Sequence, residues 1–159
     1  MNRPIELVEE TDVRKFFLFG PEGDVLAYVF LDPLYHLAEI TGYVTVIKRR
    51  HPDAPQYAEH AIMKHVIEVL KAEGIAKLKL GLSPMAWIED DEFTPSWITQ
   101  KTFRGCFKSK MINRSIYNLV GHADYKRRFR GDEEKMYYAA PARWTTTRLV
   151  AMIGLCGVA

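Results

Sequence analysis

Short apolar runs bounded by turn residues occur in the first third of the chain, and they predict β-strands there. The runs Lys15–Phe19 and Val25–Leu31 are short and rich in β-branched and aromatic residues, and Pro21-Glu22-Gly23-Asp24 between them is typical of a hairpin turn. Leu37–Ile47 has a similar composition and predicts a further strand, interrupted near Gly42. The chain is therefore expected to open with antiparallel strands.

A helical period follows these runs in Tyr57–Glu73. Apolar residues recur there at spacings of three and four, which predicts an amphipathic helix, and Gly74 is expected to end it as a C′ glycine. The apolar face comprises Ala58, Ala61, Ile62, Val66, Val69 and Leu70. Ala76–Leu82 alternates in its first half and predicts another strand, which Ser83-Pro84 ends. A long helix is thus expected between two strands.

The pattern is weaker in the second half of the chain. Ala86–Gln100 is typical of a loop, with Trp87 and Trp97 as apolar anchors, and Phe103–Lys110 fits no single element. These residues predict no regular structure before the last part of the chain.

Two more elements and a tail are expected after this stretch. Ile116–Arg128 predicts a helix, weakened at Gly121, and Lys135–Ala140 predicts a last strand, ended by Pro141. Leu149–Ala159 is apolar all round but too short to span a bilayer. This tail is expected to pack on the domain or an absent neighbour, with a position at a membrane interface as the alternative.

The order of these elements predicts an α/β (α+β) fold with a mixed, largely antiparallel sheet and a long crossover helix. Residues 1–143 are expected to form a single domain, followed by the apolar tail at 144–159. The same order is similar to the GNAT-like fold of acyl-CoA N-acyltransferases. This is an analogy of fold, and it does not by itself establish a chemistry.

Composition narrows the class of protein. The chain has 159 residues and a net charge of +2, so it is not a strongly basic protein, although Lys48–Arg50 and Lys126–Arg130 are dense basic runs suited to phosphate partners. Cys106 and Cys156 imply no disulfide framework, and the histidines lack metal-ligand spacing. No signal peptide or transmembrane run is recognised. A cytoplasmic location is expected, with peripheral association at the inner membrane as an option.

The richest stretch for chemistry is Arg49–Gln56, which is basic and contains two prolines. It lies between the expected strand and the long helix. The N–H groups and the positive dipole end of a helix start both favour a negative charge, so this connection is expected to hold an anionic ligand.

Three motifs in order resemble the C-terminal catalytic domain of the lysylphosphatidylglycerol synthases, also called phosphatidylglycerol lysyltransferases. The similarity spans roughly Val25 to Pro141. The motifs are Arg49-x-x-x-Asp53-Ala54-Pro55, then Leu80-Gly81-Leu82-Ser83-Pro84-Met85, and then Tyr117-Asn118, Gly121 and Tyr125-Lys126-Arg127-Arg128-Phe129. Each motif is weak alone, and the three together are fairly specific.

The resemblance implies an aminoacyl transferase with an acetyltransferase-like fold. Such enzymes move an amino acid from aminoacyl-tRNA to a phospholipid such as phosphatidylglycerol, and the less anionic product lowers the attraction of cationic antimicrobial peptides to the membrane. No cofactor is implied beyond the aminoacyl-tRNA co-substrate. The implied partners are the phospholipid headgroup, the aminoacyl-tRNA, a membrane surface, and a second GNAT-like domain or a second copy of the chain.

The sequence departs from the family in two places. After the first motif, the family's Asn-Gly and a following acidic residue are replaced by Gln56, Tyr57 and His60, and this affects lysyl specificity. After the third motif, Gly131-Asp132 stands where the family has Pro and Trp.

Residue roles follow the motifs, each beside a structural alternative. Asp53 is the candidate catalytic base or amino-group anchor, and the alternative is a carboxylate that caps the helix N-terminus or complements its dipole. Arg49 and Arg50 are candidate phosphate ligands, and the alternative is a solvated surface charge. Lys126 and Arg128 are expected to bind lipid phosphate or the tRNA acceptor end, unless they form a solvated helix face.

The remaining candidates are weaker. Tyr117 and Asn118 are assigned to substrate binding, although a buried aromatic ring with a bonded hydroxyl is the commoner case. Gly81 is expected to permit close backbone approach, to a ligand or within a bulge. Ser83 is placed in the substrate site but not as a nucleophile, because no base is near it in the sequence.

Two rival functions remain open. An acyl-CoA-dependent N-acyltransferase is less favoured, because no glycine occurs between Gly42 and Gly74 to form the expected pyrophosphate loop. A non-catalytic lipid-binding or RNA-binding half-domain is the third possibility.

Overall fold

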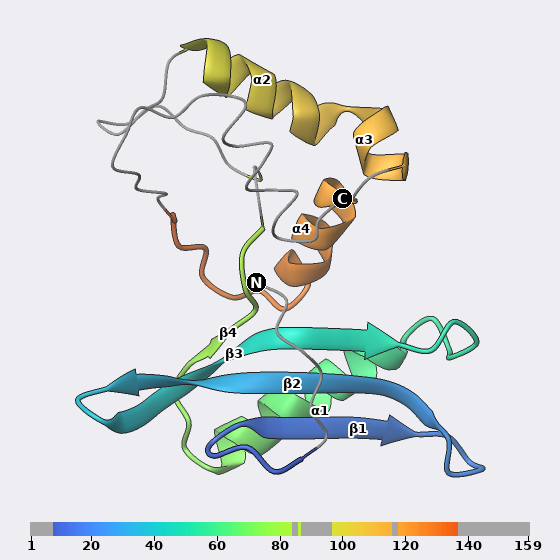
Figure 1. Ribbon diagram of the computed structural model, residues 1–159, viewed down its shortest axis with the longest axis vertical. Helices are drawn as coiled ribbons and strands as arrows, with labels where there is room; N and C mark the ends of the chain where they lie inside the picture. Colours follow the sequence, from blue (N-terminus) through green and yellow to red (C-terminus); the bar gives the residue numbers. More distant parts are fainter. Residues whose placement is uncertain (1–7, 84–85, 87–96, 116–117, 137–159) are drawn as a thin grey trace. The chain divides into compact units, whose positions relative to one another are not determined.

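The computed structural model describes residues 8–83, 86, 97–115 and 118–136 of the 159-residue chain (Figure 1). The chain divides into two compact units, Met1–Gly81 and Leu82–Ala159. The first unit is built on a sheet, and the described part of the second unit is helical. The prediction of a single domain over residues 1–143 stays a prediction.

The first unit is a four-stranded sheet with one long helix across one face (Figure 1). Strands β1, β2 and β3 pair antiparallel in that order, and β4 joins β3 in parallel. Helix α1 makes the crossover from β3 to β4. The elements are β1 (Arg14–Phe19), β2 (Val25–His36), β3 (Glu39–Arg50), α1 (Ala58–Ala72) and β4 (Leu78–Lys79). The prediction of a mixed, largely antiparallel sheet with a crossover helix is confirmed, and the GNAT-like fold stays a prediction.

The turn between β2 and β3 lies where a strand was predicted. Leu37 and Ala38 have φ angles of 49° and 68°, the left-handed conformation that a two-residue hairpin turn of type I′ requires at both positions. Strand β3 therefore begins at Glu39 and not at Leu37. It also extends to Arg50, three residues past the predicted end, because pairing with β2 continues as far as Ala27.

Gly42 permits a close approach of two segments and does not interrupt β3. A Cβ atom at this position would lie 2.5 Å from the carbonyl oxygen of Lys77, just before β4. The next residue, Tyr43, donates its N–H to the same oxygen at 2.9 Å. The strand predicted over Ala76–Leu82 is reduced to the two residues of β4.

Helix α1 confirms the prediction from periodicity, and its end is specified locally. Gly74 has a φ of +77°, and its N–H donates to Lys71 O at 3.1 Å. The N–H of Ile75 donates to Leu70 O at 2.9 Å. These two bonds form a Schellman motif, with Gly74 as the C′ residue.

The core of the first unit lies between α1 and the inner face of the sheet. Residues alternate between the two faces of a strand, so Ala27, Val29 and Leu31 of β2 all point the same way. Phe16 of β1 pairs with Val29 and contacts His65 of α1 edge-on at 6.3 Å, which identifies this face as the one under the helix. The buried residues of α1 are Ala58, Ile62, Met63, Val66 and Leu70.

The described part of the second unit contains three helices, α2 (Trp97–Lys108), α3 (Lys110–Ser115) and α4 (Leu119–Arg127). The loop predicted over Ala86–Gln100 is wrong at its end, because α2 begins at Trp97, whose side chain is 70% exposed and does not anchor a core. Phe103–Lys110, which fitted no element, is helical except at Ser109.

The end of the second unit differs from its prediction as well. Helix α4 begins three residues later than predicted and includes Gly121. Lys135 and Met136 are irregular, and the rest of the predicted last strand, the apolar tail and Trp87 lie outside the described residues. Within the described residues, no helix is long and apolar enough to cross a membrane.

Candidate functional site

The two arginines at the end of β3 point to opposite faces of the sheet. Arg50 pairs with Ala27, on the face under α1, while Arg49 pairs with Tyr28 on the other face. The two side chains therefore leave the sheet on opposite sides. They do not form a joint anion site, as they could if both arginines lay in one loop. The extension of β3 to Arg50 produces this separation, which the sequence pattern did not predict.

Arg50 stabilises the connection between β3 and α1. Its Nη1 donates to the carbonyl oxygen of Ala54 at 2.8 Å. Ala54 is only 5% exposed, and its N–H donates to His51 O at 3.1 Å, which closes a turn. The motif's alanine thus sits under the first turn of α1, and Arg50 holds its carbonyl in place. The substrate-binding role predicted for Arg50 has not been tested.

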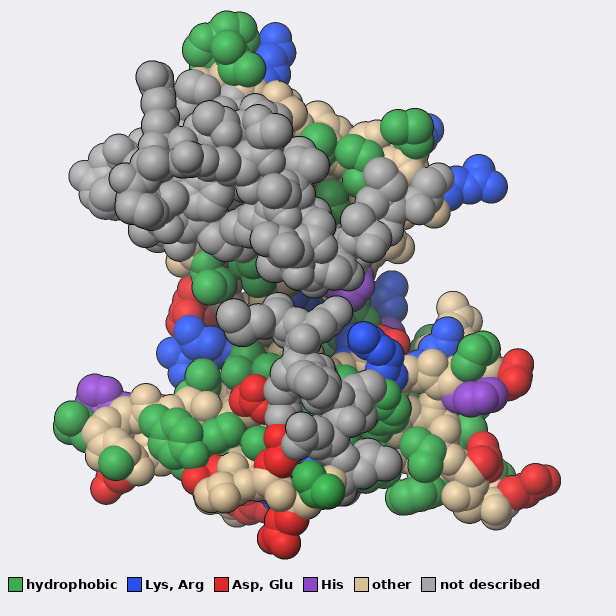
Figure 2. Space-filling view, in the orientation of Figure 1, with side chains coloured by type: hydrophobic (Ala, Val, Ile, Leu, Met, Phe, Trp, Pro, Cys, Tyr) green, Lys and Arg blue, Asp and Glu red, His purple; other side chains and the backbone are tan. Residues whose placement is uncertain are grey.

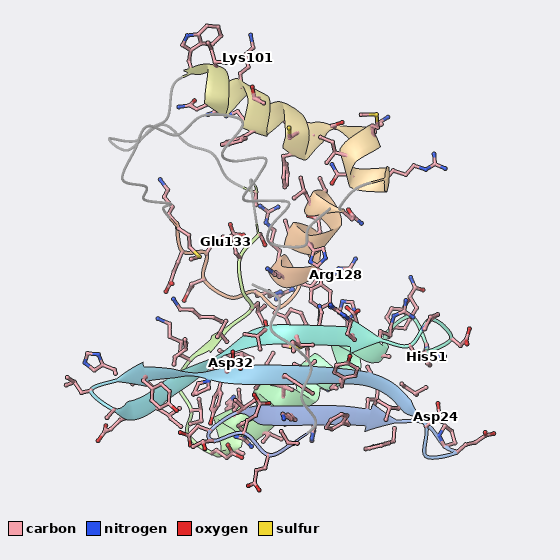
Figure 3. The ribbon with its side chains drawn as sticks, in the orientation of Figure 1. Asp24, Asp32, His51, Lys101, Arg128 and Glu133 are labelled. Atoms are coloured by element: carbon pink, nitrogen blue, oxygen red, sulfur yellow. The ribbon has the colours of Figure 1, made fainter. Side chains whose placement is uncertain are left out.

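Asp53 projects from the outside of this turn. Its carboxylate side chain is 92% exposed, and its backbone N–H donates to Nδ1 of His51 at 3.3 Å (Figure 3 labels His51). Nδ1 can accept this hydrogen bond only when it carries no proton. While the bond is formed, His51 and the Asp53 carboxylate are therefore not an ion pair, although Nδ1 lies 3.6 Å from the carboxylate. The turn orients the Asp53 backbone and leaves its carboxylate in solvent.

Asp53 is not the N-cap of α1. The N-cap position is occupied by Tyr57, with no side-chain capping bond, and the helix begins at Ala58. The alternative reading of Asp53 as a capping carboxylate is therefore wrong. The reason is that a tight turn and Pro55 occupy the residues between Asp53 and the helix.

Several backbone donors in the turn before α1 are absent or already used. Pro52 and Pro55 have no N–H, and the N–H groups of Asp53, Ala54 and Ala58 are already bonded to His51 and Pro55. An anion bound at the 52–55 turn would therefore depend on side chains such as Arg49 more than on the backbone of the turn.

A lysine pairs with the helix beside this connection. Lys48 Nζ lies 3.2 Å from Glu59 Oε2 in the first turn of α1. Burial lowers the pKa of the Lys48 ammonium below its usual value, and the Glu59 carboxylate opposes that shift. Lys48 thus belongs to the inner face of the sheet, where it supports the helix start.

The outer face of the sheet carries an aromatic cluster beside Arg49. Its members are on β1 and β2, with ring centroids 5.4 to 6.3 Å apart. The cluster consists of Phe17, Phe19, Tyr28 and Phe30. Because Tyr28 is the cross-strand neighbour of Arg49, the guanidinium emerges at the border of an apolar surface. Sequence analysis missed this cluster, although the alternating aromatic residues in β1 and β2 could have indicated it.

In the second unit, the second and third motifs meet. Lys126 Nζ donates to the carbonyl oxygen of Leu82 at 2.6 Å, across 44 residues of sequence. The carbonyl belongs to the residue just before Ser83. The ammonium therefore fixes the chain at the start of this unit, in addition to the phosphate-binding role predicted for it.

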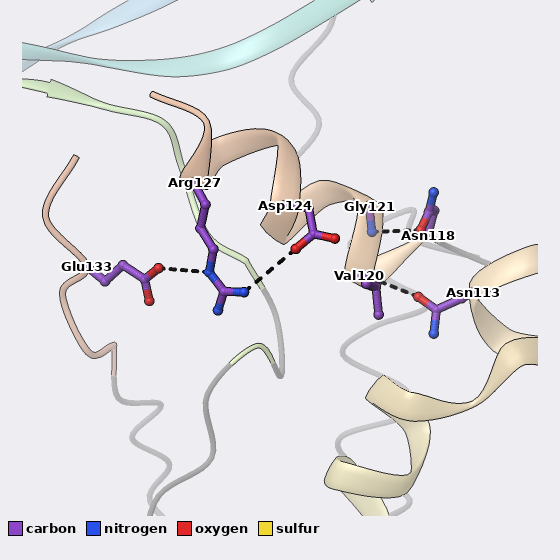
Figure 4. Close-up of polar contacts among 7 residues, drawn as sticks. All are labelled: Asn113, Asn118, Val120, Gly121, Asp124, Arg127 and Glu133. Atoms are coloured by element: carbon purple, nitrogen blue, oxygen red, sulfur yellow. Dashed lines mark hydrogen bonds and ion pairs between the residues drawn. The ribbon is translucent and has the colours of Figure 1, made fainter. Parts of the chain in front are cut away.

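Asn118 caps the N-terminus of α4. Its side-chain oxygen accepts the N–H of Gly121 at 2.8 Å (Figure 4). A Cβ at Gly121 would lie 2.3 Å from Nδ2 of Asn118, so the motif's glycine gives the capping side chain its space. Asn118 was predicted to contact substrate, and the structure gives it this structural role.

Asn113 extends the same arrangement and was missed by sequence analysis. Its Oδ1 accepts the N–H of Val120 at 2.9 Å, and its Nδ2 donates to Phe107 O and Ser109 O at 2.7 and 2.8 Å. One amide thereby links the end of α2 to the start of α4 (Figure 4). An asparagine flanked by helical residues carries no sequence signal for such a contact.

The other basic residues of α4 differ in their partners. Nε of Arg127 donates to Glu133 at 3.0 Å, and its Nη1 lies 3.7 Å from Asp124 (Figure 4). Arg128 is the exposed C-cap residue (Figure 3). Residues two apart lie on different sides of a helix, so Lys126 and Arg128 do not form one cationic face.

The predicted site residues are distributed over both units. Arg49, Arg50, Asp53 and Gly81 belong to the first unit. Gly81 has a φ of +78°, which glycine adopts without strain, and its close approach to another backbone or to a ligand stays a prediction. The second unit contains Ser83, Asn118, Lys126 and Arg128. Tyr117 lies outside the described residues.

The fold and these motifs define a mixed α+β protein whose charged motif residues lie near the ends of strands and helices. The family model described as "Phosphatidylglycerol lysyltransferase, C-terminal" matches residues 2–140, and the chain belongs to this family. The family's description implies a transferase with a phospholipid substrate. A search of the curated proteins and a search of the solved structures found no match.

Proposed function

We propose that the chain catalyses aminoacyl transfer from aminoacyl-tRNA to a headgroup hydroxyl of phosphatidylglycerol. The observation that carries this proposal is the family match over residues 2–140, together with the three motifs in their family order. The amino acid transferred is left open, because His60 stands where the family has an acidic residue suited to a cationic side chain.

The reaction replaces one ester by another. The lipid hydroxyl attacks the aminoacyl carbonyl, the new ester bond forms as the bond to the tRNA ribose oxygen breaks, and the hydroxyl proton ends on that ribose oxygen. The exchange is nearly isoenergetic, so positioning of the two substrates supplies much of the rate. A base that takes the hydroxyl proton in the transition state increases the rate further.

Asp53 is the proposed base or amino-group anchor. Its carboxylate is exposed, and its backbone is fixed by the turn that Arg50 and His51 hold. Either role requires a carboxylate that substrate can reach, and the exposure of Asp53 meets this requirement. Arg49, at the border of the aromatic cluster, is the proposed ligand for the lipid phosphate.

Transfer from acyl-CoA is the second candidate, and the structure of the β3–α1 connection disfavours it. Pyrophosphate recognition by this fold class uses consecutive N–H groups of a glycine-rich turn at the helix start. Two prolines and three internally bonded N–H groups occupy that place here.

The test is a transfer assay with the purified chain. Phosphatidylglycerol vesicles are mixed with radiolabelled aminoacyl-tRNAs, and a parallel reaction contains labelled acetyl-CoA and a polyamine. Label in the lipid supports the proposal and identifies the amino acid. Label transferred only from acetyl-CoA would replace it with the second candidate.

Variants at Asp53 test the residue assignment. Asp53→Asn keeps the shape and removes the charge, and we expect it to lower kcat by roughly 10²- to 10⁴-fold, the contribution of a positioned base. Glu22→Gln, at an exposed hairpin tip, is the matched control and should retain full activity. Full activity in a folded Asp53→Asn protein would show that the assignment is wrong.

A further inference from the structure

The connection between β3 and α1 contains a tight turn whose backbone is fixed by several bonds. The N–H of His51 donates to Leu26 O of β2 at 2.8 Å, and the N–H of Ala54 donates to His51 O at 3.1 Å. Pro52 occupies the second position of this turn, where its ring restricts φ to the value that the turn needs. Arg50 binds the Ala54 carbonyl at 2.8 Å. None of these bonds depends on the charge of the His51 ring, so they fix the turn in either charge state.

The His51 ring adds a side-chain bond within the turn. Its Nδ1 accepts the N–H of Asp53, two residues on, at 3.3 Å. Asparagine and aspartate side chains make the same bond in an Asx-turn. The imidazole therefore takes the place of an Asx oxygen, but Nδ1 is an acceptor only while the ring is neutral and carries its proton on Nε2.

The same nitrogen faces the Asp53 side chain. Nδ1 of His51 lies 3.6 Å from Oδ2 of Asp53, which is an ion-pair distance once the ring is protonated. A single nitrogen cannot accept from the N–H and donate to the carboxylate at the same time. The two side chains are 56% and 92% exposed, so the ring exchanges its proton directly with solvent. Figure 2 shows histidine and acidic side chains at the surface at this end of the sheet, where Figure 3 labels His51.

Charged groups on the neighbouring strands have contacts of their own. On β3, Arg49 donates to the carbonyl oxygen of Lys48 at 3.0 Å, and Arg50 is bound to the turn itself. In the β1–β2 turn, the carboxylate of Asp24 lies against Gly20, at the position that a Cβ there would occupy. Asp24 is therefore folded over its own turn.

The start of α1 contributes two further titratable groups. Glu59 pairs with Lys48 at 3.2 Å, and the ring of His60 packs edge-on against Tyr57 at 6.5 Å. The carboxylate that faces the His51 ring at ion-pair distance is thus that of Asp53, in the same turn.

We propose that His51 is a positioning residue that controls Asp53 through a single proton. With a neutral ring, His51 holds the Asp53 amide and leaves the carboxylate in solvent. With a protonated ring, the amide loses its acceptor and the carboxylate closes on the imidazolium. Histidine side chains ordinarily change charge between about pH 5 and 8, so the two states are compared across this range.

The consequence for catalysis rests on the proposed function. A carboxylate paired with an imidazolium is a weaker base, and it is a weaker partner for a substrate ammonium group. Aminoacyl transfer should therefore decline as His51 gains its proton, although Asp53 keeps its place in the turn.

NMR spectroscopy of the full chain tests the exchange without turnover. The backbone amide and the side-chain carboxyl carbon of Asp53 should both shift with pH, at the midpoint shown by the His51 ring, between about pH 5 and 8. Asp53 signals that do not follow the ring would overturn the proposal.

His51→Asn separates the hydrogen bond from the proton. The asparagine oxygen can accept the same N–H and does not titrate, so both Asp53 signals should lose their shift in this pH range. His36→Asn is the matched control, because His36 is exposed at the opposite end of β2 from Leu26 and should leave the shifts unchanged. Asp53 shifts that persist in His51→Asn, or disappear in His36→Asn, would overturn the proposal.

The pH profile of transfer tests the catalytic consequence. Below the His51 midpoint, kcat of the wild type should fall about tenfold per pH unit, as for one proton, and His51→Asn should lack this fall. At pH 8, His51→Ala should have a kcat roughly fivefold below that of His51→Asn, since it lacks the acceptor for the Asp53 amide. Identical profiles for the wild type and His51→Asn, or equal kcat values for the two variants, would overturn the positioning role.

The two measurements distinguish this inference from the proposed function. Coupled NMR shifts in a protein that transfers no label would support the proton exchange and contradict the proposed function alone. Transfer of label by a protein without coupled shifts would overturn the inference and leave the proposed function intact.

Discussion

The two compact units of this protein are stabilised in different ways. Of the described apolar residues that are buried, twelve belong to the first unit and two, Leu119 and Ala123, to the second. In the first unit, the inner face of the sheet and α1 share one core. In the described part of the second unit, side chains bond backbone groups instead. Asn113 links the end of α2 to α4, Asn118 caps α4, and Lys126 binds the carbonyl of Leu82.

This difference indicates which substitutions should change stability most. A core loses both transfer free energy and packing when a side chain is shortened. A capping or bridging amide loses one or a few hydrogen bonds, each with a smaller net contribution. Substitutions in the first unit should therefore act through burial, and those in the second through particular polar atoms.

The largest expected effect is that of Leu31→Ala in the first unit. Leu31 is fully buried under α1, and its truncation should lower the free energy of unfolding by about 3 kcal/mol, within the usual range for leucine cavities. Urea denaturation followed by circular dichroism measures it. Leu37→Ala is the control, because this leucine is 87% exposed in a turn and should change stability by less than about 0.5 kcal/mol. Similar losses for both variants would contradict the described core.

Asn113→Ala should have the largest effect among the polar contacts of the second unit. It removes one accepted and two donated hydrogen bonds, and we expect a loss of about 1 to 2 kcal/mol. Amide hydrogen exchange of peptides from α4 should accelerate, while exchange in α1 stays unchanged. Acceleration in both helices to the same extent would show that the two units do not respond separately.

Two glycines in the second unit provide a sharper comparison. Gly105→Ala meets open space in mid-helix and should raise stability by about 0.5 to 1 kcal/mol through helix propensity. Gly121→Ala instead drives Asn118 from its capping position, which offsets that gain by about 1 kcal/mol. The melting temperature of Gly105→Ala should therefore exceed that of Gly121→Ala. The reverse order would mean that the Asn118 cap contributes little.

The smallest expected effect is electrostatic and lies at the edge of the first unit. Arg14 of β1 donates two hydrogen bonds to the Glu73 carboxylate at the end of α1, one of them at 2.8 Å, and they lower the pKa of Glu73 below its ordinary value of 4.5. A carboxylate whose pKa is lower in the folded state than in the unfolded state stabilises the fold at pH values above the unfolded pKa. That stability is lost as the pH falls through the folded pKa.

Glu73→Gln tests this linkage. The variant should melt slightly below the wild type at pH 7, and the difference should shrink below about pH 4.5 and vanish in stronger acid. Glu68→Gln, which removes an exposed helical pair with Lys64, is the control variant. A difference for Glu73→Gln that stays constant down to low pH would contradict the ion pair.

Much of the first unit could be predicted because its signals are local. Short β-type runs bounded by a turn indicated β1 and β2, a helical period indicated α1, and Gly74 indicated the helix end. The second unit was harder to predict. Its helix α2 begins at an exposed tryptophan, and that aromatic residue indicated a core anchor when the sequence was considered alone.

The candidate site was predictable in its residues and not in its geometry. The three motifs identified the family, and the family match confirms it. The sequence could not indicate that Arg49 and Arg50 occupy opposite faces, because that depends on how far β3 pairs with β2. It also did not indicate that Lys126 holds a backbone carbonyl 44 residues away.

Local chemistry in the sequence alone determined the helix α1, its Schellman end and the motif residues of a phosphatidylglycerol lysyltransferase C-terminal domain. These features depend on backbone preferences and periodicity within a few residues. Only the tertiary structure decided which motif side chains are exposed, as at Asp53, and which are engaged, as at Arg50. Such outcomes depend on hydrogen-bond partners that pairing and packing bring together from distant parts of the chain.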